Sequence, residues 1–399
     1  MSSVSANVST TSRFSDIAKQ FRANLQTYAL IVATIFIWGF FFAMTDGGYL
    51  SAQNFSNLFR QLTVTALLSV GMVLVIVTGN IDLSVGNFAG FISVVVAKLQ
   101  NDVWRIVLPD QPLLAAVLSV LIGLAVGVMF GMIQASVIAY MRVPAFIVTL
   151  GGMWVFKGLL LIVTEGKTIA ANQPYFSAIG QGYLPPVIGW ILAVGIVVLL
   201  FYNMFSGRQK KRRYGFELTS LYMDVLKTVL FAAPVVAYVY YVNEYHGIPI
   251  PVFILAIAAV AVSYISSNTR FGRYAYAIGG NREAARLSGV SINNNIFKIF
   301  VLMGFLCGVS GIVLASYVGY GTIAAGYGYE LDAIAACILG GTSPLGGSGT
   351  IFGAMVGSLI MASLTNGLQI LNVPAAYQYV LKGIVLVLAV YADVQLKKR

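Results

Sequence analysis

Apolar runs long enough to cross a lipid bilayer recur along this chain from about residue 28 to about residue 394, and they limit what it can fold into. Hydrophobic residues make up 59% of the 399-residue sequence, and only 9% of the residues are charged. Because backbone polar groups inside a bilayer must be satisfied internally, runs of this kind form membrane-spanning helices. The sequence therefore predicts an all-α, polytopic membrane protein with one membrane domain.

The apolar runs do not all have the same character. Several neighbouring runs are separated only by short polar breaks. Two such runs can therefore belong to one membrane crossing. We expect about ten transmembrane helices, some of them broken or re-entrant. The runs lie at 28–44, 62–78, 85–99, 113–140, 146–163, 187–205, 221–242, 251–266, 297–320, 359–364 and 379–394.

The net charge of +11 is best explained by membrane topology. Under the positive-inside rule, Lys and Arg gather in cytoplasmic segments, and the RQKKRR run at 208–213 is the strongest such segment. The loops placed outside carry only Arg60, Arg105 and Lys167. We expect both termini in the cytoplasm, contact with membrane lipid, and no nucleic-acid partner. The predicted parts are a cytoplasmic N-terminal tail at 1–27, a membrane domain at 28–396 and a basic C-terminus at 397–399.

A polar, arginine-bearing segment at 268–296 separates two apolar runs, and we expect it on the cytoplasmic side of the membrane. Its middle has the signals of a short helix. Asn281 is a good N-cap residue, and Glu283 in the first turn suits the positive end of the helix dipole. Gly289 is placed to end the helix in a left-handed turn.

This predicted helix is too short to be stable alone. Ala284 and Leu287 form a small apolar ridge on it, and we expect that ridge to dock against another protein that supplies energy.

Two glycine-flanked breaks occur in the two halves of the chain, GNIDLS at 79–84 and LGGTSPLGG at 339–347. Paired interruptions of this kind are typical of transporters built from repeats. One interpretation of the first break is a broken helix beside a translocation path; the other is a tight loop in which Asp82 caps the next helix. The candidate path residues are Asn80, Asp82, Ser84, Thr342 and Ser343. A Val-Pro-Ala tripeptide followed by Lys-Gly also occurs twice, at 143–145 with 157–158 and at 373–375 with 382–383, although the spacings differ.

Several enzyme classes are disfavoured by the residue inventory. His246 is the only histidine, which argues against histidine catalysis and histidine-based metal sites. Gly166-Lys167-Thr168 resembles the end of a phosphate-binding loop, but the earlier glycine position is Leu161. We therefore expect no catalytic residues, no metal and no cofactor bound by this chain.

The motifs GNIDLSVG at 79–86, VPAFIVTLGG at 143–152, FGRYAYAIGGNREAARLSGV at 271–290 and the glycine-dense stretch at 330–360 together resemble a known family. They are similar to the permease subunits of bacterial monosaccharide ATP-binding-cassette importers, the ribose, galactose and xylose group. The resemblance covers nearly the whole chain from about residue 28, and the basic loop around 208–213 is most similar to the xylose type.

This resemblance implies the importer permease fold, a homodimer, and import of D-xylose or a similar pentose or hexose across the bacterial inner membrane. It also implies a cytoplasmic ATPase that uses ATP and Mg²⁺, a periplasmic sugar-binding protein, and a coupling helix inside the segment at 268–296. The coupling positions carried over from the resemblance are Gly280, Asn281, Glu283, Ala284, Ala285, Leu287, Ser288 and Gly289. The alternative is a proton- or sodium-coupled secondary transporter with Asp82 or Asp332 as the coupling carboxylate. A channel-like facilitator is a third class. Both alternatives predict uptake without ATP.

Overall fold

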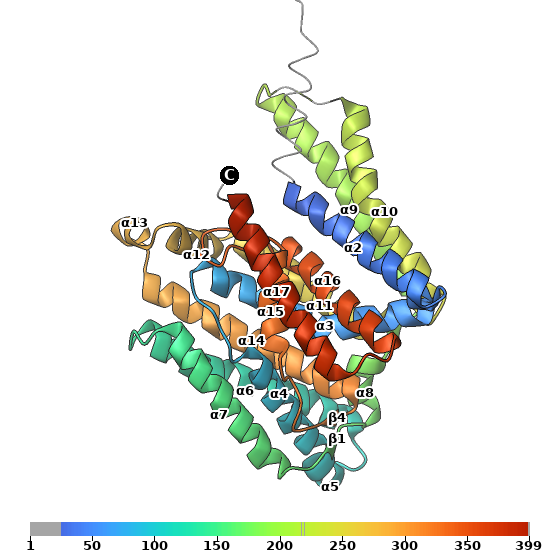
Figure 1. Ribbon diagram of the computed structural model, residues 1–399, viewed down its shortest axis with the longest axis vertical. Helices are drawn as coiled ribbons and strands as arrows, with labels where there is room; N and C mark the ends of the chain where they lie inside the picture. Colours follow the sequence, from blue (N-terminus) through green and yellow to red (C-terminus); the bar gives the residue numbers. More distant parts are fainter. Residues whose placement is uncertain (1–24, 217, 219, 398–399) are drawn as a thin grey trace, which may run out of the picture.

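The computed structural model describes residues 25–216, 218 and 220–397 (Figure 1). Most of the predicted N-terminal tail and the last two residues of the chain lie outside this range. The longer helices are α2 (Leu25–Met44), α3 (Ala52–Val77), α4 (Val85–Lys98), α6 (Pro112–Ala139), α7 (Ala145–Thr164), α9 (Pro186–Arg213), α10 (Leu221–Asn243), α11 (Ile250–Asn268), α14 (Ile292–Val318), α16 (Ile351–Ile370) and α17 (Ala375–Lys397). Shorter elements are η1 (Gly48–Leu50), η2 (Leu99–Trp104), α5 (Arg105–Val107), α8 (Pro174–Gln181), α12 (Arg270–Gly280), α13 (Arg282–Leu287) and α15 (Tyr329–Leu339).

The described residues contain eight helices that are long and apolar enough to cross a membrane. Two apolar helices below that length, Leu30–Met44 and Ala375–Leu388, are the candidates for the remaining crossings of the predicted ten. Helices α4 and α15, with 14 and 11 residues, are too short to cross alone and each adjoins one of the two breaks. The predicted fold class, polytopic and all-α with broken segments, is therefore confirmed.

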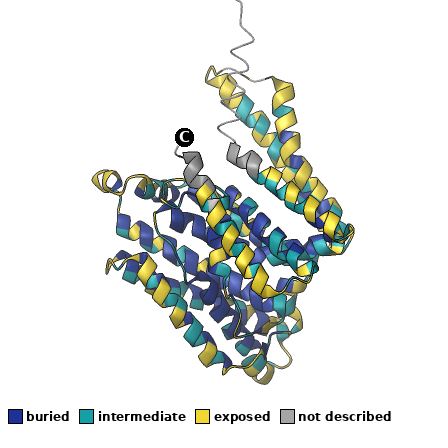
Figure 2. Ribbon diagram, viewed as in Figure 1, coloured by how far each residue is buried: buried dark blue, intermediate teal, exposed yellow. Residues whose placement is uncertain are grey.

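Helices α3 and α14 form the centre of the molecule. In their most apolar stretches 83% and 78% of the residues are buried, against 11% in α9 and 17% in α10. A helix that is hydrophobic all round belongs inside a bundle or in lipid. Figure 2 shows the buried residues concentrated in the main body, while the α9–α10 hairpin at the upper right is largely exposed.

A glycine seam brings α6 against α14. A Cβ atom added to Gly127 would stand 2.6 Å from the carbonyl oxygen of Gly304, and one added to Gly131 would stand 3.0 Å from the Cα of Gly304. Small residues at four-residue intervals allow this approach of two backbones in a membrane. The regular spacing of Gly123, Gly127 and Gly131 in the sequence corresponds to this contact.

Four two-residue strands tie the loops on the side opposite the predicted cytoplasmic segment. Strand β1 (Ile169–Ala170) pairs antiparallel with β4 (Tyr320–Gly321), and β2 (Tyr183–Leu184) pairs antiparallel with β3 (Ile248–Pro249). Ser316 at the end of α14 accepts a 2.6 Å hydrogen bond from the backbone N–H of Gly180 in α8. These pairings join loops that are far apart in the sequence.

Three boundaries differ from the sequence-based expectation. The predicted loop at 45–61 is largely helical, because Ser51 caps α3 by accepting from the backbone N–H of Asn54. The segment at 268–296 contains a second helix, α12, which Thr269 caps at its first turn. Helix α9 continues through the basic run to Arg213, where positive side chains suit the negative end of the helix dipole.

Candidate functional site

The predicted short helix in the polar segment is present as α13. The side-chain oxygen of Asn281 accepts a 2.9 Å hydrogen bond from the backbone N–H of Ala284, as expected of an N-cap. Glu283 and Arg286 form an ion pair one turn apart, and this contact raises the pKa of the Arg286 guanidinium. Gly289 has φ +80°, in the left-handed region predicted for it, and its N–H donates to the carbonyl of Arg286.

Helix α13 presents an unpartnered apolar face. The side chain of Leu287 is 76% exposed and Ala284 is exposed beside it, whereas Ala285 faces inward and is buried. Gly280 has no neighbouring atom within 4 Å of an added Cβ, and the Ser288 hydroxyl donates to the Ala284 carbonyl. Figure 1 shows α13 projecting from one edge of the molecule. An exposed leucine on a six-residue helix has the geometry of a docking contact, and the coupling role of this set stays a prediction.

The first break lies between α3 and α4. Asp82 is buried, and one of its carboxylate oxygens accepts from the backbone N–H and the hydroxyl of Ser84, at 2.8 and 2.6 Å. Ser84 in turn contacts Gln134 of α6. Asp82 thus stabilises the turn before α4, whose N-cap residue is Ser84, and a path role for this break stays a prediction. Of the path candidates in this break, Asn80 is only half-buried, whereas Asp82 and Ser84 lie in the interior.

The second break lies between α15 and α16 and is also folded inward. Thr342 is fully buried, and its hydroxyl has no hydrogen-bond partner in the described part of the chain. Ser343 is buried as well, and its backbone N–H donates to the carbonyl of Ser348 across the loop. A path role for Thr342 and Ser343 stays a prediction.

The two breaks meet each other and the end of α12. The backbone N–H of Gly347 donates a 2.8 Å hydrogen bond to the carbonyl of Val77, the last residue of α3. A Cβ added to Gly279 of α12 would stand 1.6 Å from that same carbonyl oxygen and 2.6 Å from the nitrogen of Gly347. Three segments far apart in the sequence therefore touch backbone to backbone, two residues before the linker to α13. We refer to Val77, Gly279 and Gly347 as the inner junction.

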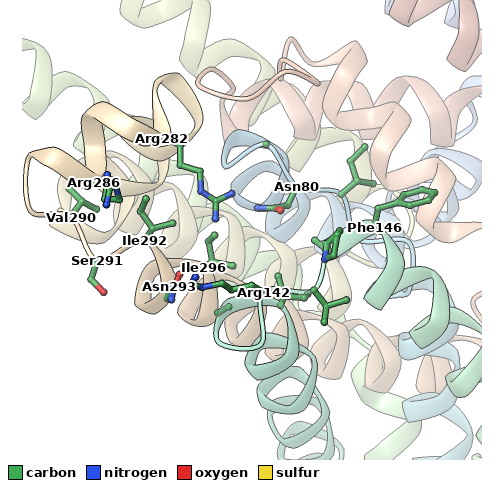
Figure 3. Close-up of a pocket in the computed structure, with 17 residues that line it drawn as sticks. Asn80, Arg142, Phe146, Arg282, Arg286, Val290, Ser291, Ile292, Asn293 and Ile296 are labelled. Carbon is green, nitrogen blue, oxygen red and sulfur yellow. The ribbon is translucent and has the colours of Figure 1, made fainter.

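A cavity of about 880 Å³ opens beside the inner junction (Figure 3). Its walls come from the first break, the α6–α7 turn, α13 and the start of α14. Figure 3 shows Arg282 pointing from α13 toward Asn80, and Arg142 extending toward Asn293. None of the described residues that line it is acidic. No group of three or more His, Cys, Asp or Glu side chains in the described residues is arranged to hold a metal ion.

Two lysines inside apolar helices define a polar face that sequence analysis did not select. Lys157, past the middle of α7, donates to the carbonyl of Ile323 in the loop before α15 and lies 6.0 Å from the centre of the Tyr327 ring. Lys382 of α17 forms a 2.8 Å ion pair with Asp332 of α15. The repeated Lys-Gly dipeptide was the available signal, because a charge inside an apolar run is costly and marks a functional position.

Comparison with known proteins places the chain in a family. The family described as "Branched-chain amino acid transport system / permease component" matches residues 54–390, most of the chain. This chain belongs to that permease family. It is 40% identical over 377 residues to the xylose transport system permease protein XylH of Haemophilus influenzae, covering 94% of this chain and 98% of the relative.

Two further relatives show the breadth of the likeness. XylH of Escherichia coli (strain K12) is 41% identical over 94% of this chain and 93% of its own length. The ribose import permease protein RbsC of the same strain is 33% identical over 86% of this chain and 87% of its own length. No solved structure matches the chain.

Proposed function

We propose that this permease carries a monosaccharide, D-xylose or a similar pentose or hexose, into the cytoplasm, and that a separate ATPase drives the transport. The names of its relatives, a xylose and a ribose permease, support a sugar as the substrate. We place it in the bacterial inner membrane with both termini in the cytoplasm. Nucleotide and Mg²⁺ belong to the partner ATPase, and this chain binds no cofactor.

The inner junction is the observation that carries this proposal. A docked partner that moves α13 also moves the end of α12, because only the linker residue Asn281 separates the two helices. Gly279 is in direct backbone contact with both breaks, so its displacement cannot be absorbed by side-chain rotation. Rigid-body movement of the helices that follow the breaks, α4 and α16, is the expected result.

The polar face around Lys157 supports a second copy of this chain as a partner. Lys157 is only half-buried and its hydrogen bond to the Ile323 carbonyl is exposed, and a charge inside an apolar helix is costly where it faces lipid. Gly158 on α7 and Gly383 on α17 leave open space beside this face, which permits close approach of another helix. Two copies that face each other there would enclose a wet path for the sugar. A periplasmic sugar-binding protein would deliver the substrate to its outer end.

Reconstitution tests the function directly. The chain is purified with its copurifying ATPase, placed in liposomes, and supplied with candidate binding proteins loaded with xylose, ribose or galactose. We expect one loaded binding protein to stimulate ATP hydrolysis and sugar uptake together. Uphill uptake by the chain alone, without nucleotide, would instead favour the proton- or sodium-coupled transporter.

A cysteine at Gly383 tests the dimer face. Gly383→Cys on α17 is expected to give a disulfide between two copies in the membrane, because open space adjoins that position. Val198→Cys on the exposed face of α9 is the matched control and should remain monomeric after oxidation. Crosslinking through α9 and not through α17 would contradict this arrangement.

A further inference from the structure

The cavity beside the inner junction has an unbalanced positive charge. Arg142, Arg282 and Arg286 all line it, and no described lining residue is acidic. Arg286 is paired with Glu283, but neither Arg142 nor Arg282 has an ion-pair partner among the described residues. Two guanidinium groups that converge on one space without a counter-charge attract an anion, and arginine suits phosphate because it donates in a fork.

Two helix N-termini add to the same field. Residues 144–146 at the start of α7 and 291–293 at the start of α14 line the cavity. The N-cap residues Pro144 and Ser291 make no side-chain capping hydrogen bond, so neither neutralises the first backbone N–H groups. Each long helix directs the positive end of its dipole toward the space that the arginines share.

The surface beside the cavity is apolar, in contrast to its positively charged interior. Phe146, which lines the cavity, exposes 54% of its surface, and Met141 and Ile147, each next in sequence to a lining residue, expose 70% and 59%. They continue into the lipid-exposed sides of α6 and α7. An occupant with a phosphate head and apolar chains would satisfy both the arginines and this apolar surface, whereas inorganic phosphate would leave the apolar surface uncovered.

We propose that the cavity binds the phosphate headgroup of an anionic phospholipid from the cytoplasmic leaflet. Arg142 and Arg282 hold the phosphate, the N-termini of α7 and α14 face it, and the acyl chains lie along Phe146 and Ile147. Basic pockets between helix ends on the cytoplasmic side are suited to such headgroups. This site is independent of the sugar that the permease carries.

Retention of lipid by the full-length chain tests the proposal. The protein is reconstituted in phosphatidylcholine containing a minor fraction of phosphatidylglycerol, extracted into detergent, and examined by native mass spectrometry. We expect phosphatidylglycerol to remain bound selectively. Arg142→Gln with Arg282→Gln should weaken its binding roughly 25-fold, from about 1 kcal/mol for each arginine near the membrane surface.

Matched variants guard against a folding effect. Arg282→Gln alone, at an exposed position, should weaken binding about fivefold with unchanged thermal unfolding. Arg270→Gln, an exposed cytoplasmic arginine outside the cavity, should leave binding unchanged. Equal lipid retention by wild type and the double variant would overturn the proposal.

Two further experiments distinguish a lipid headgroup from soluble phosphate and from an acidic side chain of the ATPase. Millimolar inorganic phosphate should not displace the lipid, and its displacement would mean that the cavity takes soluble phosphate. The lipid should also stay bound when the ATPase is assembled on the permease. Its loss on assembly would show that the cavity receives an acidic side chain of the ATPase instead.

Discussion

The backbone N–H of Gly347 donates a 2.8 Å hydrogen bond to the carbonyl oxygen of Val77, and this bond joins the two helix breaks directly. No side chain mediates the contact, and Gly279 of α12 packs against the same carbonyl. The inner ends of α3, α12 and the loop before α16 therefore form one mechanical unit. Under the proposed function, a protein docked on α13 would act on the membrane domain through this unit.

Adding a methyl group to the inner junction should uncouple it. Gly279→Ala places a Cβ 1.6 Å from the Val77 carbonyl oxygen, and overpacking of this kind costs about 1–3 kcal/mol. We expect a loss of sugar-stimulated ATP hydrolysis and of uptake, by about tenfold or more. Gly195→Ala, on the exposed part of α9, meets nothing within 4 Å and should behave as wild type. Equal uptake by the two variants would show that the junction transmits nothing.

The end of α13 should depend on its left-handed residue. Gly289 has φ +80° and open space around an added Cβ, so a substitution acts through backbone strain alone. Gly289→Val should abolish transport while membrane insertion stays intact, since a left-handed β-branched residue costs about 1–2 kcal/mol or more. Gly289→Asn should keep most activity because asparagine tolerates this conformation. Full transport by the valine variant in proteoliposomes would refute the coupling assignment.

The exposed leucine of α13 should govern binding of the ATPase. Leu287→Ala removes an apolar group that is 76% exposed in the free chain, and a central contact of this type contributes about 2 kcal/mol to an interface. We expect the dissociation constant of the ATPase to rise about thirtyfold in a titration with nanodisc-embedded permease. Tyr214→Ala, similarly exposed beyond the end of α9, is the control. An unchanged affinity for the leucine variant would place the docking contact elsewhere.

Lys382 and Asp332 should show a large coupling free energy in a double-mutant cycle of unfolding stability. Both side chains are mostly buried, so Lys382→Met leaves an uncompensated carboxylate and should destabilise the fold by about 3–5 kcal/mol. Lys382→Met combined with Asp332→Leu should recover most of that loss, because both charges are then absent. The stability of the wild type, the two single variants and the double variant is measured by thermal unfolding in nanodiscs. If the losses of the single variants simply add in the double variant, the two side chains do not interact.

Replacing Asp82 with asparagine should separate two classes of transporter. The Asp82 carboxylate serves as acceptor for the N–H and hydroxyl of Ser84, and the side-chain oxygen of asparagine can accept both. ATP-driven uptake by Asp82→Asn should therefore stay within about threefold of wild type, whereas Asp82→Ala loses the turn and should cost about 1 kcal/mol of stability. Complete loss in the asparagine variant, with normal folding, would point to a titrating carboxylate.

Local chemistry allowed much of this structure to be predicted. The apolar runs gave the class, and eight of the described helices have the length expected of a crossing because hydrocarbon thickness sets helix length. Asn281 and Gly289 defined α13 correctly because capping is decided by neighbouring backbone groups. Helix α12 was missed, since three of its eleven residues are glycine, a poor helix former, and its N-cap, Thr269, lies inside a polar run.

The contacts that assemble the candidate site could not be predicted in the same way. Val77, Gly279 and Gly347 meet through main-chain atoms, and no side-chain pattern encodes which backbones come together. The cavity likewise depends on bringing Arg142 and Arg282 together from distant segments. Lys157 and Lys382 were visible as charges in apolar runs, yet only the fold shows that both reach the residues around α15.

The seam between α6 and α14 limits how this protein can evolve. Gly127 and Gly304 are already the smallest residues possible. A larger residue at one position therefore cannot be compensated by a smaller residue at the other. An enlargement on one helix has no single compensating change on its partner and requires the whole crossing to shift. We therefore expect these two positions to accept substitutions far more slowly than the exposed faces of α9 and α10.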